Sequence, residues 1–281
     1  MRSEEFDIVI RSGKQRYRNS RRELWQYRDL VLLLVRRDFV SGYKQTVLGP
    51  AWAVVQPLIS TLMTALVFGG LAGLSPDGIP VFLFYMSGQV VWAFFSGCVY
   101  TVSGTFLNNA DLMGKVYFPR LAVPVAGCIS QLISFLIQSA LFAVFYTVYV
   151  ICGVPVRPDI TLLLMPVFII QLMMLALGCG ALLSAMTTRY RDTFFLITYG
   201  LTFWMYISPV VYDVDLVPER FMTLYMINPV SPVMTNIRCA LFGQGKFYYG
   251  YWFMSIVITI VFFSVGVRVF DRVQRNFLDT I

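Results

Sequence analysis

Six long stretches of this chain contain no charged residue, and they limit its possible fold more than any other feature. They cover residues 45–76, 78–110, 121–156, 160–188, 193–212 and 247–267. A helix needs about 20 apolar residues to cross a bilayer core, a length that buried helices of soluble proteins seldom reach. Only 13% of all residues are charged, against about a quarter in soluble domains. We therefore predict an all-α polytopic membrane protein with six transmembrane helices, near residues 48–74, 80–108, 122–153, 160–187, 193–212 and 247–267.

The distribution of Lys and Arg predicts the orientation of these helices. Of 22 such residues, 18 lie in residues 1–44, in the connections 111–120 and 189–192, or after residue 267, all on one side of the six spans. Cytoplasmic loops carry the excess of positive charge, so both termini are expected in the cytoplasm. The net charge of +7 indicates affinity for anionic lipid heads and no nucleic-acid partner. Because residues 1–29 are strongly polar, no cleavable signal peptide is expected there.

The chain is expected to divide into a cytoplasmic arm, residues 1–44, and a transmembrane domain, residues 45–281. Within the arm, Ser20 and Glu23 match a capping box at a helix start. The following residues, 24–39, mix apolar side chains with Arg28, Arg36 and Arg37, as in an amphipathic helix lying in the headgroup region. A soluble helix before the first span is the alternative; we favour the interface helix.

The segment 213–246, between the fifth and sixth spans, is too long for a simple connection. It contains Pro218, Pro229 and Pro232, yet residues 221–227 are apolar. Short apolar pieces separated by proline are typical of re-entrant half-helices, which persist at membrane depth only where protein covers them. The pattern equally fits an amphipathic helix on the outer surface. The predicted architecture includes the re-entrant version between helices 5 and 6.

Several kinds of chemistry are missing from the sequence. The chain has no histidine and no Gly-x4-Gly-Lys-Ser/Thr segment, so a P-loop for ATP is excluded. No metal or cofactor site is expected, and no catalytic residues are assigned. The five scattered cysteines are interpreted as packing residues rather than as a disulfide framework.

The spans also lack the ionisable groups that usually mark ion-coupling pathways in transporters. If this chain moves a substrate, the free energy is expected to come from a separate ATPase subunit, which would bind ATP and Mg²⁺. Without histidine an integral-membrane hydrolase or acyltransferase is disfavoured, and a carboxylate-based enzyme stays open as an alternative. We expect a transporter subunit rather than an enzyme.

Aromatic and neutral polar residues recur at helical spacing in two spans. Residues three or four apart share one face of a helix, and this relation joins two sets: Tyr85, Gln89, Trp92, Ser96 and Tyr100, and Phe195, Tyr199, Phe203 and Tyr206. Rings that stack on sugars, beside groups that bind hydroxyls, would suit a pathway for a polysaccharide. The alternative is that the rings form interfacial belts and that the polar groups join helices.

Several segments together resemble the membrane subunits of ABC-2-type exporters of bacterial surface polysaccharides, the O-antigen and teichoic-acid permease family. The matching pieces are Arg37-Asp38, residues 43–52 with Gln56-Pro57, Lys115-Val116-Tyr117-Phe118-Pro119-Arg120 with Pro124, Tyr190-Arg191-Asp192, Ser208-Pro209-Val210-Val211-Tyr212, and Asn228-Pro229 followed by Arg238. Their order and spacing extend from about residue 30 to the end of the chain.

This resemblance implies a homodimer in the bacterial plasma (inner) membrane, with two cytosolic ABC ATPase subunits bound below it. The cargo implied is a glycan linked to undecaprenyl diphosphate. By the same resemblance, residues 20–44 form the interface helix, residues 111–120 contact the ATPase, and residues 208–238 include the outer gate.

Two sets of residues receive roles from these matches. Contact with the ATPase is expected from Lys115, Tyr117, Phe118, Pro119 and Arg120, because aromatic residues beside basic ones in a water-facing loop favour protein docking. Contact with the lipid diphosphate is expected from Arg37, Lys44 and Arg120, since Arg and Lys pair well with phosphate. An ABC-2 exporter of a drug or small lipid is the main alternative; an enzyme acting on polyprenyl-linked sugars and a passive channel are others.

Overall fold

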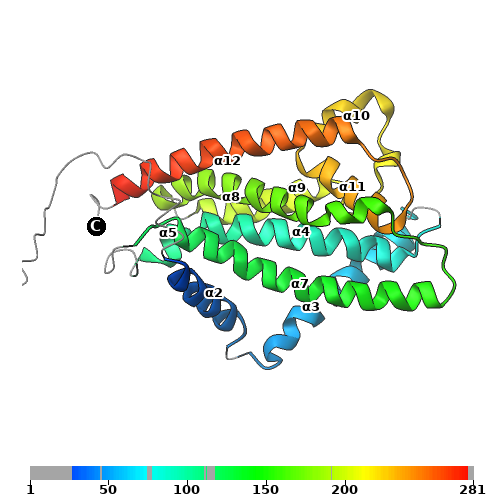
Figure 1. Ribbon diagram of the computed structural model, residues 1–281, viewed down its shortest axis with the longest axis horizontal. Coiled ribbons are helices and arrows are strands. Elements are labelled where there is room, and N and C mark those ends of the chain that lie inside the picture. Colours follow the sequence, from blue (N-terminus) through cyan, green and yellow to red (C-terminus); the bar gives the residue numbers. More distant parts are fainter. Residues whose placement is uncertain are drawn as a thin grey trace, which may run out of the picture.

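The computed structural model describes residues 27–44, 46–74, 78–110, 112, 118–190 and 192–277, and every regular element in these ranges is helical (Figure 1). The principal helices are α2 (Arg28–Tyr43), α3 (Trp52–Thr64), α4 (Val81–Ser103), α5 (Thr105–Asn108), α7 (Ala122–Ile151), α8 (Met165–Arg189), α9 (Thr193–Ile207), α10 (Glu219–Met226), α11 (Val230–Phe242) and α12 (Tyr249–Phe277). A π-helical segment, Ala65–Leu71, continues α3, and a 3-10 turn, Ile160–Leu164, leads into α8. The all-α prediction is confirmed for these residues.

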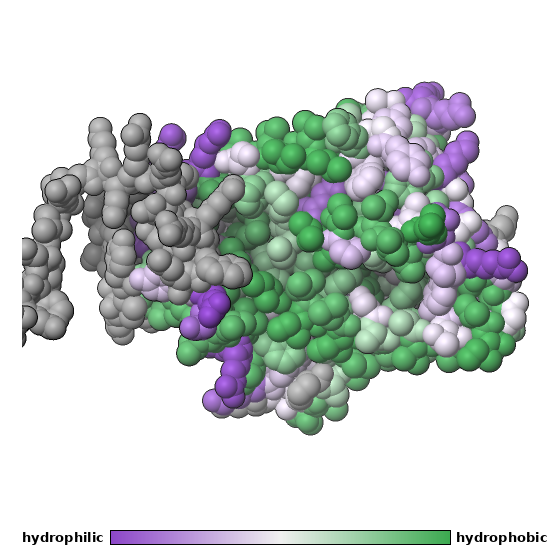
Figure 2. All heavy atoms as spheres, viewed as in Figure 1, coloured by the Kyte–Doolittle hydropathy of each residue, from purple (hydrophilic) through white to green (hydrophobic). Residues whose placement is uncertain are grey.

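Five of the helical segments are long and apolar enough to cross a bilayer. They are Trp52–Leu71, Val81–Ser103, Ala122–Ile151, Ile160–Arg189 and Tyr249–Gln274. Figure 2 shows the result on one face, where green apolar side chains cover the middle and purple hydrophilic ones gather towards the two ends. This band of apolar surface is the side-chain arrangement expected of a membrane protein.

The predicted span 193–212 is shorter than expected. Its helix, α9, has 15 residues and ends at Ile207, which gives a length of about 22 Å. Pro209 explains this end, because a proline disfavours helical backbone at the residue before it. Ser208 is indeed extended, with ψ of 155°, and the chain continues as turns through Tyr212.

Helix α4 forms the centre of the bundle. It packs against α7 on one side and α8 on another, and α8 in turn packs along α12. In the window that qualifies α4 as a span, 67% of the residues are buried, against 28% or fewer in the other four. Small residues allow the closest approach of α8 and α12: a Cβ atom on Gly266 would clash with the backbone of Gly178, as is typical of helix packing in membranes.

Helix α2 makes up nearly all of the N-terminal arm that the structure describes. Its buried residues Val31, Leu34 and Val35 lie at helical spacing, and the helix packs on α7. Arg36 is exposed. The proposed capping box at Ser20 and Glu23 lies outside the described residues.

The segment 213–246 forms two helices of different character. Helix α11 is buried along almost all its length, where it packs against α4, α8 and α12. Helix α10 exposes Phe221 and Leu224. Both helices lie at the end of the bundle opposite α2 and α5 (Figure 1).

Candidate functional site

A polar cavity of about 500 Å³ lies where α2 meets the ends of α4 and α7. Its lining residues are Arg37, Asp38, Ser41, Thr101, Thr105, Asn108, Asn109, Val123, Gly127, Ser130 and Gln131. One of them, Arg37, belongs to the first segment of the family resemblance and was expected to contact the lipid diphosphate. This cavity is the candidate site that the sequence analysis and the structure share.

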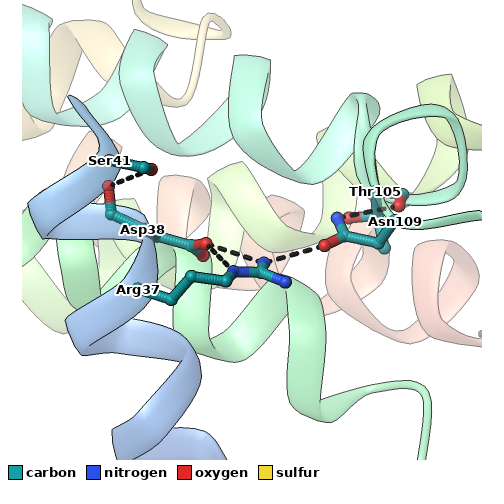
Figure 3. Close-up of polar contacts among 5 residues, drawn as sticks. All are labelled: Arg37, Asp38, Ser41, Thr105 and Asn109. Carbon is teal, nitrogen blue, oxygen red and sulfur yellow. Dashed lines mark hydrogen bonds and ion pairs between the residues drawn. The ribbon is translucent and has the colours of Figure 1, made fainter. Parts of the chain in front are cut away.

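Arg37 is held in the cavity by two neighbours (Figure 3). Its Nε and Nη2 atoms donate to Oδ1 of Asp38 at 2.9 and 2.7 Å, and Nη2 also donates to Oδ1 of Asn109 at 2.8 Å. Asn109 is oriented by its own donation from Nδ2 to the carbonyl oxygen of Thr105, 3.1 Å away. The guanidinium therefore spans from α2 to the chain after α5.

The ion pair between Arg37 and Asp38 is weak enough for Arg37 to bind another anion instead. The Arg37 side chain is 41% exposed, and ion pairs of such exposure contribute about 0–1 kcal/mol. Nη1 of Arg37 makes no hydrogen bond to any described residue. A phosphate oxygen arriving in the cavity can therefore use donors of this guanidinium at little energetic cost, since Arg presents five N–H donors in a plane.

The remaining wall of the cavity is neutral and rich in hydroxyl and amide groups. Nε2 of Gln131 donates to Oγ1 of Thr101 at 3.3 Å, which joins α7 to α4. Gly127 makes this approach possible, because a Cβ atom there would come within 2.5 Å of the Thr101 methyl group. Such a wall offers hydrogen bonds to a hydroxylated ligand without adding charge.

The other two residues expected at the diphosphate, Lys44 and Arg120, do not line this cavity. Lys44 is exposed at the end of α2. Arg120 is only 8% exposed, and its Nη1 donates to the carbonyl oxygen of Gln274 in α12 at 2.9 Å. Burial lowers the pKa of this guanidinium, which nevertheless stays protonated at neutral pH because arginine starts above 12. Arg120 thus joins the turn before α7 to α12.

The loop expected to contact an ATPase is described only in part. Lys115 and Tyr117 lie outside the described residues. Phe118 is 5% exposed and packs in the core, and Pro119 is half-buried. The expectation that Phe118 faces water was therefore wrong, because the chain turns inward before α7 and packs this ring.

The aromatic stripe on α9 is at the surface of the protomer. The exposed fractions of Phe195, Tyr199, Phe203 and Tyr206 are 71%, 66%, 70% and 47%. The opposite side of α9 packs on α4, where the Trp204 ring meets Phe95 with centroids 5.2 Å apart. Four large side chains on one face thus have little cover within the protomer.

The residues of the predicted stripe on α4 differ in their exposure. Tyr85 is fully buried and its hydroxyl donates to the carbonyl oxygen of Leu74 at 2.8 Å, while Trp92 is 5% exposed. Gln89 is half-buried and donates to Oγ1 of Thr64 in α3 at 3.1 Å. Ser96 is half-buried and Tyr100 is 42% exposed. The two predicted stripes do not form one wall within the protomer, and their role in a pathway stays a prediction.

Arg238 was included in the resemblance without a role, and the structure gives it one. It lies in α11, is 8% exposed, and donates from Nη2 to the carbonyl oxygen of Val210 at 2.6 Å and from Nη1 to that of Tyr212 at 3.1 Å. Its guanidinium carbon lies 3.8 Å from the centroid of the Phe84 ring in α4. The single arginine in an apolar helix was the sequence signal for such a contact.

A second link joins two segments of the resemblance. Asn228 accepts a hydrogen bond at Oδ1 from Nε1 of Trp204, 2.9 Å away, and donates from Nδ2 to Oγ of Ser208 at 2.9 Å. The start of the α11 segment is thereby fixed to the end of α9. Together with Arg238, Asn228 joins α4, α9 and α11 into one unit at this end of the bundle.

Comparison with known families decides the membership of the chain. The family model described as "ABC-2 type transporter" matches residues 29–242, from the start of α2 to the end of α11. The chain belongs to the ABC-2 transporter family. The family resemblance seen in the sequence is therefore confirmed.

Individual relatives of this ABC-2 transporter chain align over most of its length. It is 24% identical over 258 residues to a protein of Klebsiella pneumoniae named "O-antigen export system permease protein RfbA", an alignment that covers 90% of this chain and 95% of the relative. It is 25% identical over 263 residues to a protein of the same name from Myxococcus xanthus, which covers 92% of this chain and 98% of the relative.

Proposed function

We propose that this chain is the membrane-spanning permease subunit of an ATP-driven exporter of a lipid-linked surface polysaccharide of the O-antigen or teichoic-acid type. The observation that carries the proposal is the near full-length similarity to two permeases of O-antigen export systems. The chain has no P-loop sequence, so the ATPase of such a system would be a separate subunit.

The proposed placement in the bacterial plasma (inner) membrane follows from charge and length. The five long helices and the shorter α9 would give six crossings, with α9 completed by the buried turn 208–211. Because positive charge gathers at the α2 end, both termini would be cytoplasmic. Helix α11 would then be a re-entrant element on the outer side, where protein covers it as such elements require.

The proposed assembly is a homodimer with two cytosolic ATPase subunits. Leu62 on α3 and Leu66 on the π-helical segment that continues it are exposed apolar side chains, as are the rings of the α9 stripe. Phe68 and Tyr206 bring the two elements together, with ring centroids 6.3 Å apart. A second copy meeting this region would enclose the α9 rings in a shared path, where they could stack on sugar rings. The loop 111–120 would meet the ATPase.

Recognition of the carrier is proposed for the polar cavity. Arg37 would bind the diphosphate of an undecaprenyl-linked glycan, and the hydroxyl and amide groups of Thr101, Ser130 and Gln131 would bind the first sugar. A drug or small lipid would make little use of these neutral hydrogen-bonding groups.

The experiment that tests this function is co-purification of the chain with the ATPase encoded beside it, followed by an ATPase assay. A stable complex whose ATP hydrolysis rises with lipid-linked glycan is the expected result. Stimulation by a drug or by a small lipid alone would replace the polysaccharide with that substrate. Failure to bind any ATPase would contradict both kinds of exporter.

A further inference from the structure

An apolar groove of about 630 Å³ lies between α7 and α8, with α4 as its floor. The groove exists because α7 and α8 both pack on α4 but touch one another little, since α8 packs most extensively on α12. Its walls include Leu136 and Ile170, which are 58% and 55% exposed, so it opens to the surroundings of the protein. Along α7 its lining runs from Leu132 to Thr147, a length of about 22 Å at about 1.5 Å per residue.

Water is a poor occupant for this groove. A stable buried water needs two to four polar partners, and the lining is almost wholly aliphatic and aromatic. An empty groove would deprive its walls of van der Waals contacts on one side. The groove is about as long as a fatty acyl chain is when extended, and it lies on spans that bring it into the hydrocarbon phase.

An exposed arginine lies next in sequence to one end of the groove. Pro158 and Leu162 line that end, and Arg157, directly before Pro158, is exposed. Among the described residues the Arg157 guanidinium has no hydrogen-bond or ion-pair partner. The nearest acid in sequence, Asp159, is engaged by the backbone amide and the hydroxyl group of Thr161.

We propose that this groove binds one acyl chain of a phospholipid with an anionic headgroup, and that Arg157 pairs with the headgroup phosphate. The proposal depends on the membrane placement given above but not on the identity of the exported cargo. An apolar slot with an exposed arginine directly before one of its lining residues complements an anionic phospholipid in both charge and shape. The groove opens between α7 and α8, whereas the proposed dimer surface is formed by α3 and α9, so the site would remain open to lipid in the dimer.

The test uses the full-length chain in phosphatidylcholine vesicles. The vesicles carry a trace of phosphatidylglycerol or of phosphatidylcholine with a photoreactive diazirine on one acyl chain. After illumination, the labelled peptides are located by mass spectrometry. We expect peptides covering residues 132–147 and 162–170 to be labelled about fivefold more by phosphatidylglycerol, the preference that one basic residue gives near a membrane surface.

Two pairs of variants test the headgroup contact and the acyl-chain contact separately. Arg157→Gln should reduce the fivefold preference to about one, while Arg220→Gln, which removes an exposed arginine on α10 at the same end of the bundle, should leave it unchanged. Ala143→Phe fills the groove and should remove the label there. Val144→Phe adds the same ring at a neighbouring surface position outside the lining and should retain it.

Several results would overturn the proposal. These are equal labelling by the two lipids, a preference that survives Arg157→Gln, or displacement of the label by a polyprenyl phosphate but not by unlabelled phosphatidylglycerol. If Ala143→Phe fails to fold, as judged by size-exclusion chromatography, the Arg157→Gln comparison decides. The assay contains neither ATPase nor glycan, so a negative result here does not contradict the exporter proposal. Conversely, failure of the chain to bind an ATPase would not contradict the proposal that the groove binds a phospholipid.

Discussion

The guanidinium of Arg238 in α11 lies over the Phe84 ring of α4, with its central carbon 3.8 Å from the ring centroid. The same group donates to the carbonyl oxygen of Val210 at 2.6 Å. Three segments that are far apart in the sequence therefore meet at one buried positive charge. The cation–π contact and the carbonyl groups replace part of the hydration that this charge loses, while its buried Nε has no hydrogen-bond partner among the described residues.

Replacing Arg238 should destabilise the α10–α11 end of the bundle. Arg238→Gln leaves the carbonyl groups of Val210 and Tyr212 without their present donor, and we expect a loss of about 2–4 kcal/mol in unfolding free energy. Denaturant unfolding of the purified chain measures this. Arg220→Gln is the matched control, since Arg220 lies over the Phe221 ring but is exposed, and it should cost under about 1 kcal/mol. Equal losses in the two variants would contradict the assigned role.

Gly88 should not tolerate even one added methyl group. A Cβ atom there would lie 2.6 Å from both the carbonyl oxygen of Val210 and Nη2 of Arg238, and the backbone oxygen cannot move without shifting the turn after α9. Gly88→Ala should therefore cost about 1–3 kcal/mol and lower the thermal unfolding midpoint. Gly200→Ala in α9 has open space around the new atom and should be neutral or slightly stabilising. A neutral Gly88→Ala variant would show that α4 and the turn are packed less closely than described.

Arg37→Gln should reduce export while the chain still assembles with its ATPase. The variant removes the charge offered to a diphosphate, a contact of about 1.5–3 kcal/mol, which corresponds to a loss of about tenfold or more in affinity for the lipid-linked substrate. Surface polysaccharide and ATPase co-purification are the two measurements. Arg36→Gln is the control, because Arg36 is exposed and does not line the cavity. Unchanged export in Arg37→Gln would remove this residue from the site.

The α9 stripe is tested by paired truncations. Tyr199→Ala and Phe203→Ala should lower export at least several-fold. An aromatic side chain that stacks on a nucleic-acid base contributes about 1–3 kcal/mol, and we expect stacking on a sugar ring to act in the same way. Leu196→Ala, at a 69% exposed aliphatic neighbour, should have a smaller effect. Cross-linking of the dimer in the same samples distinguishes a pathway residue, which leaves the dimer intact, from a dimer contact. If neither export nor the dimer changes, the stripe is simply facing lipid.

Cys152 reports the orientation of the chain. It is the exposed one of the five cysteines, the other four being buried, and it follows α7 at the end of the bundle opposite α2. A membrane-impermeant maleimide should label right-side-out vesicles and not inverted ones, and Cys152→Ser should remove the label. Labelling of inverted vesicles alone would reverse the proposed topology.

Some parts of the site were readable in the sequence. The Arg37-Asp38 pair was identified as part of the resemblance, and Arg37 does line a polar cavity. The early end of α9 could have been predicted from Pro209, because the effect of a proline on the preceding residue is local. The burial of Phe118 could not, since a loop ring between basic residues has no periodic pattern that indicates its direction.

The sequence by itself determined that this is a helical membrane protein and where its five long helices lie, because charge-free length is a property of each segment alone. Helical spacing also showed that Phe195, Tyr199 and Phe203 share one face. Only the tertiary structure decided which neighbour each face meets: it buries Tyr85 and leaves Tyr199 exposed. A helix that is apolar all round has no polar side to mark its outer surface, so packing against the central helix α4 makes that choice.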